Sequence, residues 1–232
     1  MQISIIIPTY NEAEHISCLV THLWANARQS VADIIVVDGG STDNTLAYAQ
    51  AAGAQAILAP TKGRAVQMNL GATLAQGEIL YFVHADAFPP ATYVQDIAEA
   101  LQEGFPIGCY RFRFKSDKLL LKINSYCTRF DRIMCRGGDQ TLFVTRRVYD
   151  EFNGYKPDFV IMEEYDFIIR VRKKYPFKII PKDVLVSARK YDYNGYFRVN
   201  LANLTVFLMF FAGFSQAQLL NTYKRMIHHP KF

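Results

Sequence analysis

The sequence predicts an α/β fold with a mainly parallel central sheet that is flanked by helices. Two observations support this prediction. Short apolar runs alternate with longer segments of helical pattern four times within the first hundred residues. The runs at 3–8 and 33–38 are rich in Ile and Val, which is typical of strands that are buried on both faces.

Composition narrows the class of protein. Half of the 232 residues are apolar and a fifth are charged, which permits a sizeable core in one domain and excludes disordered, collagen-like and disulfide-scaffold proteins. The four cysteines are scattered without a C-x-x-C pair, so we expect no structural zinc and predict reduced, buried thiols in a cytoplasmic protein. The residues after Met1 lack the pattern of an export signal.

The elements of the first half follow one another closely. Residues 3–8 form the first strand, which Pro8 ends. Asn11 and Glu14 have the spacing of a capping box, so we expect a helix from Asn11 to about residue 27. Ser41 or Thr42 is expected to cap the helix that follows the second strand. The further elements are expected at 33–38 (strand), up to 53 (helix), 54–58 (strand), 64–75 (helix) and 79–83 (strand).

The second half has a less regular pattern. Residues 108–115 alternate between aromatic and basic side chains, which predicts a half-exposed strand with a basic outer face. A helix is expected over 117–134, a short strand over 141–145 and another helix over 162–174. Residues 199–214 are mostly apolar but fall short of the roughly 20 residues of a membrane span.

Charge is distributed unevenly along the chain. Residues 1–110 hold three basic and ten acidic side chains, whereas residues 111–232 hold 23 basic and 11 acidic ones. A basic second half favours an anionic partner, and phosphate groups, anionic lipid and nucleic acid all remain open on this ground.

Two carboxylates follow predicted strands, at the sheet edge where open α/β sheets bind ligands. Asp38 precedes two glycines and could accept hydrogen bonds from a base or ribose, or could simply form the turn. Asp86 could hold a divalent cation together with a diphosphate, or could cap a helix. The chain lacks both the G-x-G-x-x-G and the P-loop fingerprints, which disfavours a Rossmann dehydrogenase and a P-loop NTPase.

Further charged residues are candidates for catalysis and phosphate binding. Glu163 and Glu164 begin a predicted helix, where acids favour the helix dipole. Crowded carboxylates can also serve as a general base, because repulsion raises the pKa of one of them. Arg64 with Lys62, and Arg189 with Lys190, could contact phosphate, and arginine suits bidentate contact better than lysine does; a plain surface role is the default for each.

Several stretches of the chain together resemble family 2 glycosyltransferases with the GT-A fold, in particular a bacterial subgroup of small, single-domain members. The first two stretches are specific in combination, and the set spans nearly the whole chain. The matching stretches are 5–12 (IIIPTYNE), 36–45 (VVDGGSTDNT), 63–69 (GRAVQMN), 84–86 (HAD), 137–140 (GGDQ), 154–155 (GY), 162–164 (MEE) and 186–190 (VSARK).

The resemblance implies a nucleotide-sugar donor, usually a UDP-sugar, and a divalent metal such as Mg²⁺ or Mn²⁺. It implies an inverting transfer of hexosyl type to an acceptor hydroxyl, without a covalent enzyme intermediate. On the matching positions, Pro8, Thr9, Glu12 and Asp38 would line the nucleoside pocket, with Arg64 nearby.

The same resemblance assigns the chemical groups. Asp86 takes the place of the last Asp of the family's D-x-D motif and would bind the metal and the diphosphate, whereas His84 stands at the first Asp. Glu163 and Glu164 take the place of the family's Glu-Asp pair, so Glu164 is the first choice for the catalytic base and Glu163 the second. Acceptor or phosphate binding falls to Asp139 and Arg189.

Three other functions compete with this interpretation. A sugar-phosphate nucleotidyltransferase would carry a glycine-rich basic loop after the first strand, where this chain has Pro8 to Glu12. A nucleotide-sugar-binding protein with impaired catalysis is favoured by His84 and Glu164. A nucleic-acid binder would use the basic half, but no recognisable module supports it.

The division of the chain follows from these assignments. We expect a glycosyltransferase domain over 1–195, with a nucleotide-binding half (1–110) and an acceptor-binding half (111–195). Residues 196–232 would form a helical appendage that either associates with the inner face of a membrane or packs against protein in a core or an oligomer. A lipid-linked acceptor would suit the membrane alternative.

Overall fold

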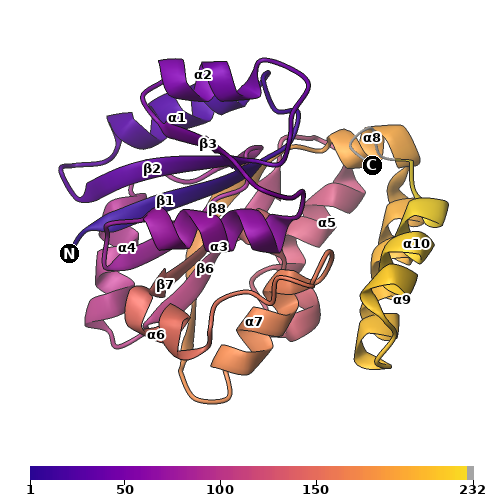
Figure 1. Ribbon diagram of the computed structural model, residues 1–232. Helices are drawn as coiled ribbons and strands as arrows, with labels where there is room; N and C mark the ends of the chain where they lie inside the picture. Colours follow the sequence, from indigo (N-terminus) through magenta and orange to yellow (C-terminus); the bar gives the residue numbers. More distant parts are fainter. Residues whose placement is uncertain (229–232) are drawn as a thin grey trace.

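An eight-stranded sheet forms the centre of the computed structural model, which describes residues 1–228 (Figure 1). The strand order is β3-β2-β1-β4-β7-β6-β8-β5. Strands β3, β2, β1 and β4 run parallel, as do β6 and β8, whereas β7 and β5 pair antiparallel with their neighbours. The prediction of a mainly parallel sheet is confirmed. The strands are β1 (Ile3–Thr9), β2 (Val31–Asp38), β3 (Gln55–Leu58), β4 (Ile79–Phe82), β5 (Ala87–Phe88), β6 (Ile107–Phe114), β7 (Leu142–Thr145) and β8 (Phe177–Val186).

Helices cover both faces of the sheet, and the two faces have separate apolar clusters. One face packs against α1 (Ile16–Ala25), α2 (Thr45–Ala51) and α4 (Tyr93–Gln102). The other face packs against α3 (Arg64–Leu74), α6 (Arg146–Glu151) and α7 (Glu163–Val171). The remaining helices lie toward one side of the sheet (Figure 1): α5 (Leu119–Cys127), α8 (Arg189–Asn194), α9 (Tyr196–Phe211) and α10 (Gln216–Met226).

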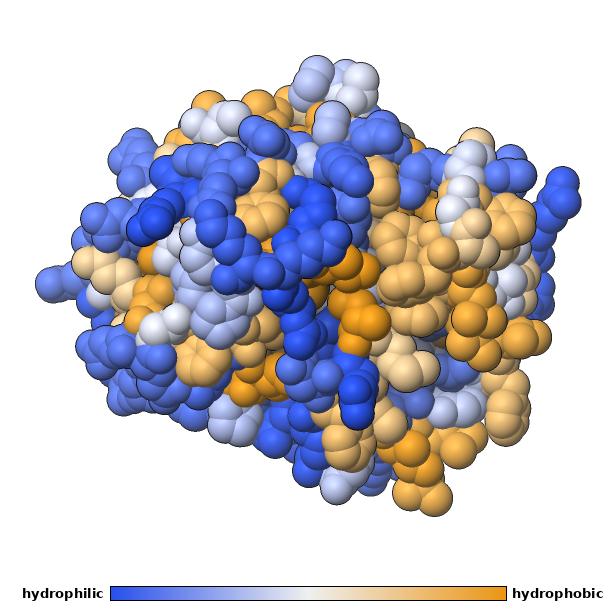
Figure 2. Space-filling view, turned by 90° about the horizontal axis from the view of Figure 1, so that it is seen from below, coloured by the Kyte–Doolittle hydropathy of each residue, from blue (hydrophilic) through white to orange (hydrophobic). Residues whose placement is uncertain are grey.

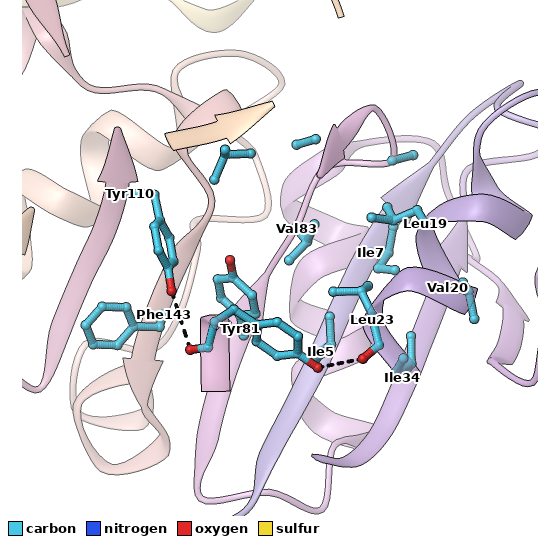
Figure 3. Packing of buried hydrophobic residues seen from close by; sticks show 14 of the residues in the cluster. Ile5, Ile7, Leu19, Val20, Leu23, Ile34, Tyr81, Val83, Tyr110 and Phe143 are labelled. Carbon is cyan, nitrogen blue, oxygen red and sulfur yellow. Dashed lines mark hydrogen bonds between the residues drawn. The ribbon is translucent and has the colours of Figure 1, made fainter. Parts of the chain in front are cut away.

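The larger core lies between the sheet and α1 (Figure 3). Every residue of β1 is buried, as its continuous apolar run predicts. The α1 side chains Leu19, Val20 and Leu23 pack against this face. Two tyrosines bring their hydroxyl groups into the core, and both find acceptors: Tyr93 donates to the Leu23 carbonyl at 2.9 Å and Tyr110 to the Tyr93 carbonyl at 3.4 Å. These bonds avoid the cost of a buried unpaired hydroxyl.

The predicted helix start at Asn11 is wrong, because α1 begins at Ile16 without a side-chain cap. Asn11 instead joins two loops. Its side-chain carbonyl accepts the backbone N–H of Thr42 at 2.9 Å, and its own N–H donates to the Ser41 hydroxyl at 2.7 Å. Its φ of 54° is the left-handed conformation that Asn tolerates better than most residues. The helix also stops at Ala25, two residues before the predicted end.

Three other local predictions are corrected. The residue directly before α2 is Asn44, not Ser41 or Thr42. The Ser41 hydroxyl donates to the Asp38 carboxylate and the Thr42 backbone N–H donates to the Asn11 side chain, so both residues belong to the preceding loop. The helix predicted over 117–134 ends at Cys127, since the Arg136 guanidinium takes the carbonyl of Thr128 that a longer helix would use internally. The four cysteines are free, but they are not all buried: Cys18 is exposed.

The C-terminal helices α9 and α10 lie side by side at the right of Figure 1. A capping box begins α10, in which Ser215 and Gln218 satisfy each other's backbone groups. No helix within residues 1–228 is both long enough and apolar enough to cross a bilayer. The sheet continues from β4 to β7 without a break, so residues 1–110 and 111–195 share one sheet. The predicted functional division into halves stays a prediction, and the last four residues of the predicted appendage lie outside the described part of the chain.

Candidate active site

Most of the sequence-predicted residues gather at the edge of the sheet where β1, β2 and β4 end. They form two groups. The first, which we call the Asp38 turn, comprises Thr9, Asp38, Gly40 and Ser41. The second, which we call the charged cluster, brings together α3, the end of β4, the turn at residues 138–140 and the start of α7: Arg64, His84, Asp139, Glu163 and Glu164.

The Asp38 turn is held together by hydrogen bonds within the chain. The Asp38 carboxylate is fully buried. One oxygen accepts the backbone N–H groups of Gly40 and Ser41 at 2.8 and 2.7 Å, and the other accepts the hydroxyls of Ser41 and Thr9. These contacts are those of a turn-forming Asp. A contact with a nucleoside stays a prediction for Asp38, and also for Pro8, which is buried in β1 beside Val37.

Glu12 connects the ends of β1 and β8. Its carboxylate is 7% exposed and lies 3.0 Å from the Arg189 guanidinium. The same guanidinium lies 3.7 Å from Asp86. Burial alone would lower the pKa of Arg189, but Glu12 and Asp86 raise it. Arg189 therefore lies between two acids at the sheet edge, where a phosphate group could compete for it.

Glu163 is the most deeply buried acid of the charged cluster, with 1% of the residue exposed. Its Oε1 lies 2.9 Å from Nε of Arg64, but the N–H is poorly directed. Within residues 1–228, neither oxygen of Glu163 has a well-formed hydrogen bond. Burial, with the repulsion of Glu164, raises the pKa of the Glu163 carboxyl despite Arg64. Arg64 thus contributes a neighbouring positive charge, but both carboxylate oxygens of Glu163 can still accept hydrogen bonds.

His84 lies between two carboxylates. Its Nε2 is 3.0 Å from Oε1 of Glu164, and its Nδ1 is 3.7 Å from Oδ1 of Asp139. Burial alone would lower the pKa of His84, but the two carboxylates raise it to about 10, so the ring is an imidazolium near neutral pH. Burial alone would raise the pKa of Glu164, but the imidazolium outweighs it and holds this pKa below its usual range. Glu164 is therefore anionic at neutral pH.

Asp86 and Asp139 are the carboxylates of this site that could hold a divalent cation. Burial, followed by the repulsion of Asp139 and Glu12, raises the pKa of Asp86. A bound cation would relieve this crowding. Protonated His84 has no lone pair to offer. Residues 1–228 contain no group of three or more His, Cys, Asp or Glu side chains placed to hold a metal, but Mg²⁺ and Mn²⁺ often bind one or two carboxylates together with phosphate oxygens.

Gly138 lies directly against the ion pair of His84 and Glu164. A Cβ added to this glycine would lie 2.1 Å from Cε1 of His84 and 2.3 Å from Oε2 of Glu164. No side chain fits there, so the backbone of residue 138 must approach the ion pair directly. The pair of glycines at 137–138 is visible in the sequence, but its purpose depends on contacts with β4 and α7.

The structure adds two details to the site, at Met162 and at Lys190. Met162 has a φ of 66°, a strained conformation for a residue with a side chain, and it places Glu163 and Glu164 in the first turn of α7. Lys190 lies near Asp139 and Arg64, and burial lowers its pKa to about 8. The sequence offers Lys190 together with Arg189 as a phosphate contact, whereas no local pattern indicates the left-handed backbone of Met162.

With this geometry established, comparison with known proteins decides the family. Residues 4–162 match the family described as Glycosyl transferase family 2. The chain belongs to this family. An uncharacterized glycosyltransferase of Mycobacterium tuberculosis is 28% identical over 180 residues, which cover 72% of this chain and 68% of that protein. A PGL/p-HBAD biosynthesis glycosyltransferase of Mycobacterium bovis is 30% identical over 195 residues, with the same coverage. An uncharacterized glycosyltransferase of Nostoc is 31% identical over 114 residues, which span 47% of this chain and only 35% of that longer protein.

Solved structures show the same fold at lower identity. S. aureus TarS in complex with UDP has a TM-score of 0.66 at 16% identity, covering 97% of this chain and 70% of that one. Glucosyl-3-phosphoglycerate synthase from Mycobacterium tuberculosis, in complex with Mn²⁺, UDP and glucosyl-3-phosphoglycerate, has a TM-score of 0.63 at 17% identity, with coverage of 88% and 78%. The predicted GT-A fold of this family 2 member is confirmed.

Proposed function

We propose that this protein is an inverting glycosyltransferase of hexosyl type, which moves a sugar from a UDP-sugar to an acceptor hydroxyl with the help of Mg²⁺ or Mn²⁺. The observation that carries the proposal is the charged cluster: two adjacent buried acids at the start of α7 that meet Arg64 and His84 at the sheet edge. The solved relatives that bind UDP and Mn²⁺ support the choice of donor and metal.

The donor would bind across the ends of β1, β2 and β4. The nucleoside would lie near Thr9, Glu12 and the Asp38 turn, and the diphosphate near Arg64 and Arg189. Arginine suits phosphate because its planar guanidinium can form two parallel hydrogen bonds. Asp86 and Asp139 would hold the divalent metal, which when bound supplies positive charge to the diphosphate.

Glu164 is proposed as the general base. Its carboxylate is anionic and less deeply buried than that of Glu163. It would accept the proton of the acceptor hydroxyl as that oxygen forms a bond to the anomeric carbon. The bond from this carbon to the diphosphate breaks on the opposite side, so the configuration inverts in one displacement. Arg64 and the His84 imidazolium would stabilise the charge on the departing diphosphate.

His84 has two consequences for this chemistry. Its contact with Glu164 orients the carboxylate and keeps it ionised. The same contact lowers the pKa of Glu164 and so makes it a weaker proton acceptor. This observation also favours a second candidate, a nucleotide-sugar-binding protein with impaired catalysis. The two differ in turnover and agree in donor binding.

Calorimetric titration with UDP, with and without Mn²⁺, tests the proposal on wild type and Asp86→Ala. We expect Mn²⁺ to tighten UDP binding at least about tenfold, and Asp86→Ala to remove that gain. The exposed Asp158→Ala serves as the matched control and should leave the affinity unchanged. Failure of the folded wild type to bind UDP under either condition would overturn the proposal. Release of UDP from a panel of UDP-sugars then separates the transferase from the impaired binder.

A further inference from the structure

Helix α9 exposes an apolar stripe that the rest of residues 1–228 leaves uncovered. The exposed side chains recur at intervals of three and four, so they lie along one face of the helix. Phe197 is 78% exposed, and Leu201 and Leu208 are 59% exposed each. The opposite side packs against α10 and the segment before α7. The stripe consists of Phe197, Leu201, Leu204, Leu208 and Phe211.

A second apolar stripe lies on α5, directly beside the first. Leu119 is 72% exposed and Ile123 is 49% exposed. Asn124 joins the two helices, because its side chain accepts the Tyr196 hydroxyl at 2.7 Å and donates to Asn200 at 3.1 Å. We call the two stripes together the α5–α9 face. Figure 2 shows hydrophobic residues gathered on the right of the molecule, the side on which α9 lies in Figure 1. Apolar surface on this scale marks an interaction site.

Basic side chains outnumber acidic ones in the segments that form and adjoin the α5–α9 face. Residues 118–135 contain four basic side chains and one acidic one, and residues 196–226 contain three basic side chains and no acidic one. Two of the lysines, Lys118 and Lys122, have exposed acidic neighbours in Asp192 and Asp117. Such exposed pairs are weak and yield readily to another anion. An apolar stripe with a basic border is the pattern of a helix that lies in the headgroup region of an anionic bilayer.

The side of α9 opposite to its exposed stripe lies next to the charged cluster. Ile161 and Met162, which directly precede Glu163, pack against the apolar cluster between α9 and α10. The ring of Tyr165, which follows Glu164, lies 5.8 Å from the ring of Phe207 on α9. A surface that covers α9 would therefore lie close to the start of α7.

We propose that the α5–α9 face docks on an anionic membrane surface, with α5 and α9 lying along the lipid headgroups. A second copy of the chain fits less well, because protein interfaces are depleted of lysine. On the proposed function, docking would bring the charged cluster to acceptors carried by the membrane. The docking itself does not depend on that function.

Co-sedimentation with vesicles tests the docking directly. The vesicles contain equal parts of phosphatidylglycerol and phosphatidylcholine, or phosphatidylcholine alone. We expect the wild type to bind the anionic vesicles at least about tenfold more tightly than the neutral ones, and to weaken as salt rises. The variant Leu201→Gln/Leu208→Gln should lose at least about tenfold in affinity for the anionic vesicles.

The matched control is Leu58→Gln/Leu74→Gln, which changes two exposed leucines far along the chain from the α5–α9 face. It should bind the vesicles within about twofold of wild type. Equal binding by both double variants would overturn the proposal. So would a wild type that ignores the vesicles and forms a dimer that Leu201→Gln/Leu208→Gln abolishes. UDP titration of the same variants tests the proposed function separately, since it requires no membrane.

Discussion

Two acidic regions at one edge of the sheet are built in opposite ways. In the Asp38 turn, the carboxylate is satisfied by four donors from neighbouring backbone and hydroxyl groups. In the charged cluster, Glu163 and Glu164 form ion pairs with Arg64 and His84 from distant elements, and within residues 1–228 Glu163 keeps unused hydrogen-bonding capacity. The difference teaches that the first acid organises the chain, whereas the second pair is held by ionic contacts that a bound ligand could exchange.

Glu164→Gln should give the largest effect. If Glu164 is the base, sugar transfer should fall by roughly 10² to 10⁴-fold, while UDP affinity stays within a few-fold, because the amide cannot accept the proton. UDP release from the donor measures the rate. Asp166→Asn on the same helix is the control: Asp166 pairs with Lys156 and Arg170, so its loss should affect stability and spare turnover. Equal losses of rate in both variants would remove Glu164 from the role of base.

Asp38→Ala should chiefly affect folding. The change leaves the buried donors of the turn without an acceptor, so the free energy of unfolding should fall by about 2 kcal/mol or more. Urea denaturation measures it. Asp33→Ala removes a single bond to the Gln76 backbone near the surface and should cost about 1 kcal/mol or less. A fully stable Asp38→Ala variant that has lost UDP binding would assign Asp38 to the nucleoside instead.

Gly138→Ala should disturb the charged cluster through shape alone. The added methyl group collides with His84 and Glu164, so we expect a loss of about 1 to 3 kcal/mol in unfolding free energy and a marked loss of turnover. Gly137→Ala is a close control, because a Cβ there would meet only the Tyr165 hydroxyl, at 3.8 Å. Thermal unfolding of both variants measures the difference. Equal tolerance of the two changes would show that the backbone need not approach the ion pair.

Lys190 should give the charged cluster a small pH dependence. Burial lowers its pKa from 10.5 to about 8 in the folded state. Between these values the unfolded chain binds a proton that the folded chain does not, so stability from this group rises with pH through that window. Relative to Lys190→Met, the free energy of unfolding of the wild type should rise by about 1 kcal/mol between pH 8 and 10. This is less than the full pKa shift would give, because the side chain is partly hydrated. Urea unfolding at both pH values measures this, and parallel curves for the two proteins would contradict it.

The sequence anticipated the first half of the fold well, because its central strands β1, β2 and β4 are largely apolar. Strands β1 and β2 and helix α3 lie within two residues of the predicted positions. The second half was harder. Strand β8 contains exposed Lys and Pro among its apolar residues, because helices cover it only in part. Helix α4 was not predicted, because two prolines precede it and hide its start.

The candidate site shows the same limit. Motifs singled out Asp38 and Asp86, which follow strands, and Glu163 and Glu164, which begin a helix, because these residue types and positions are visible locally. The pairing of His84 with Glu164 was not foreseen, because the two are 80 positions apart in the sequence. A protonated histidine in place of an acid changes the electrostatics of the site, and only the fold shows which carboxylates surround it.

The most direct test of the account is the crystal structure of the protein with UDP and Mn²⁺. We expect the diphosphate beside Arg64 and Arg189, the metal on Asp86 and Asp139, and the bonds of the Asp38 turn intact. UDP that binds elsewhere, or that leaves the charged cluster untouched, would contradict the claim that this cluster is the site of chemistry.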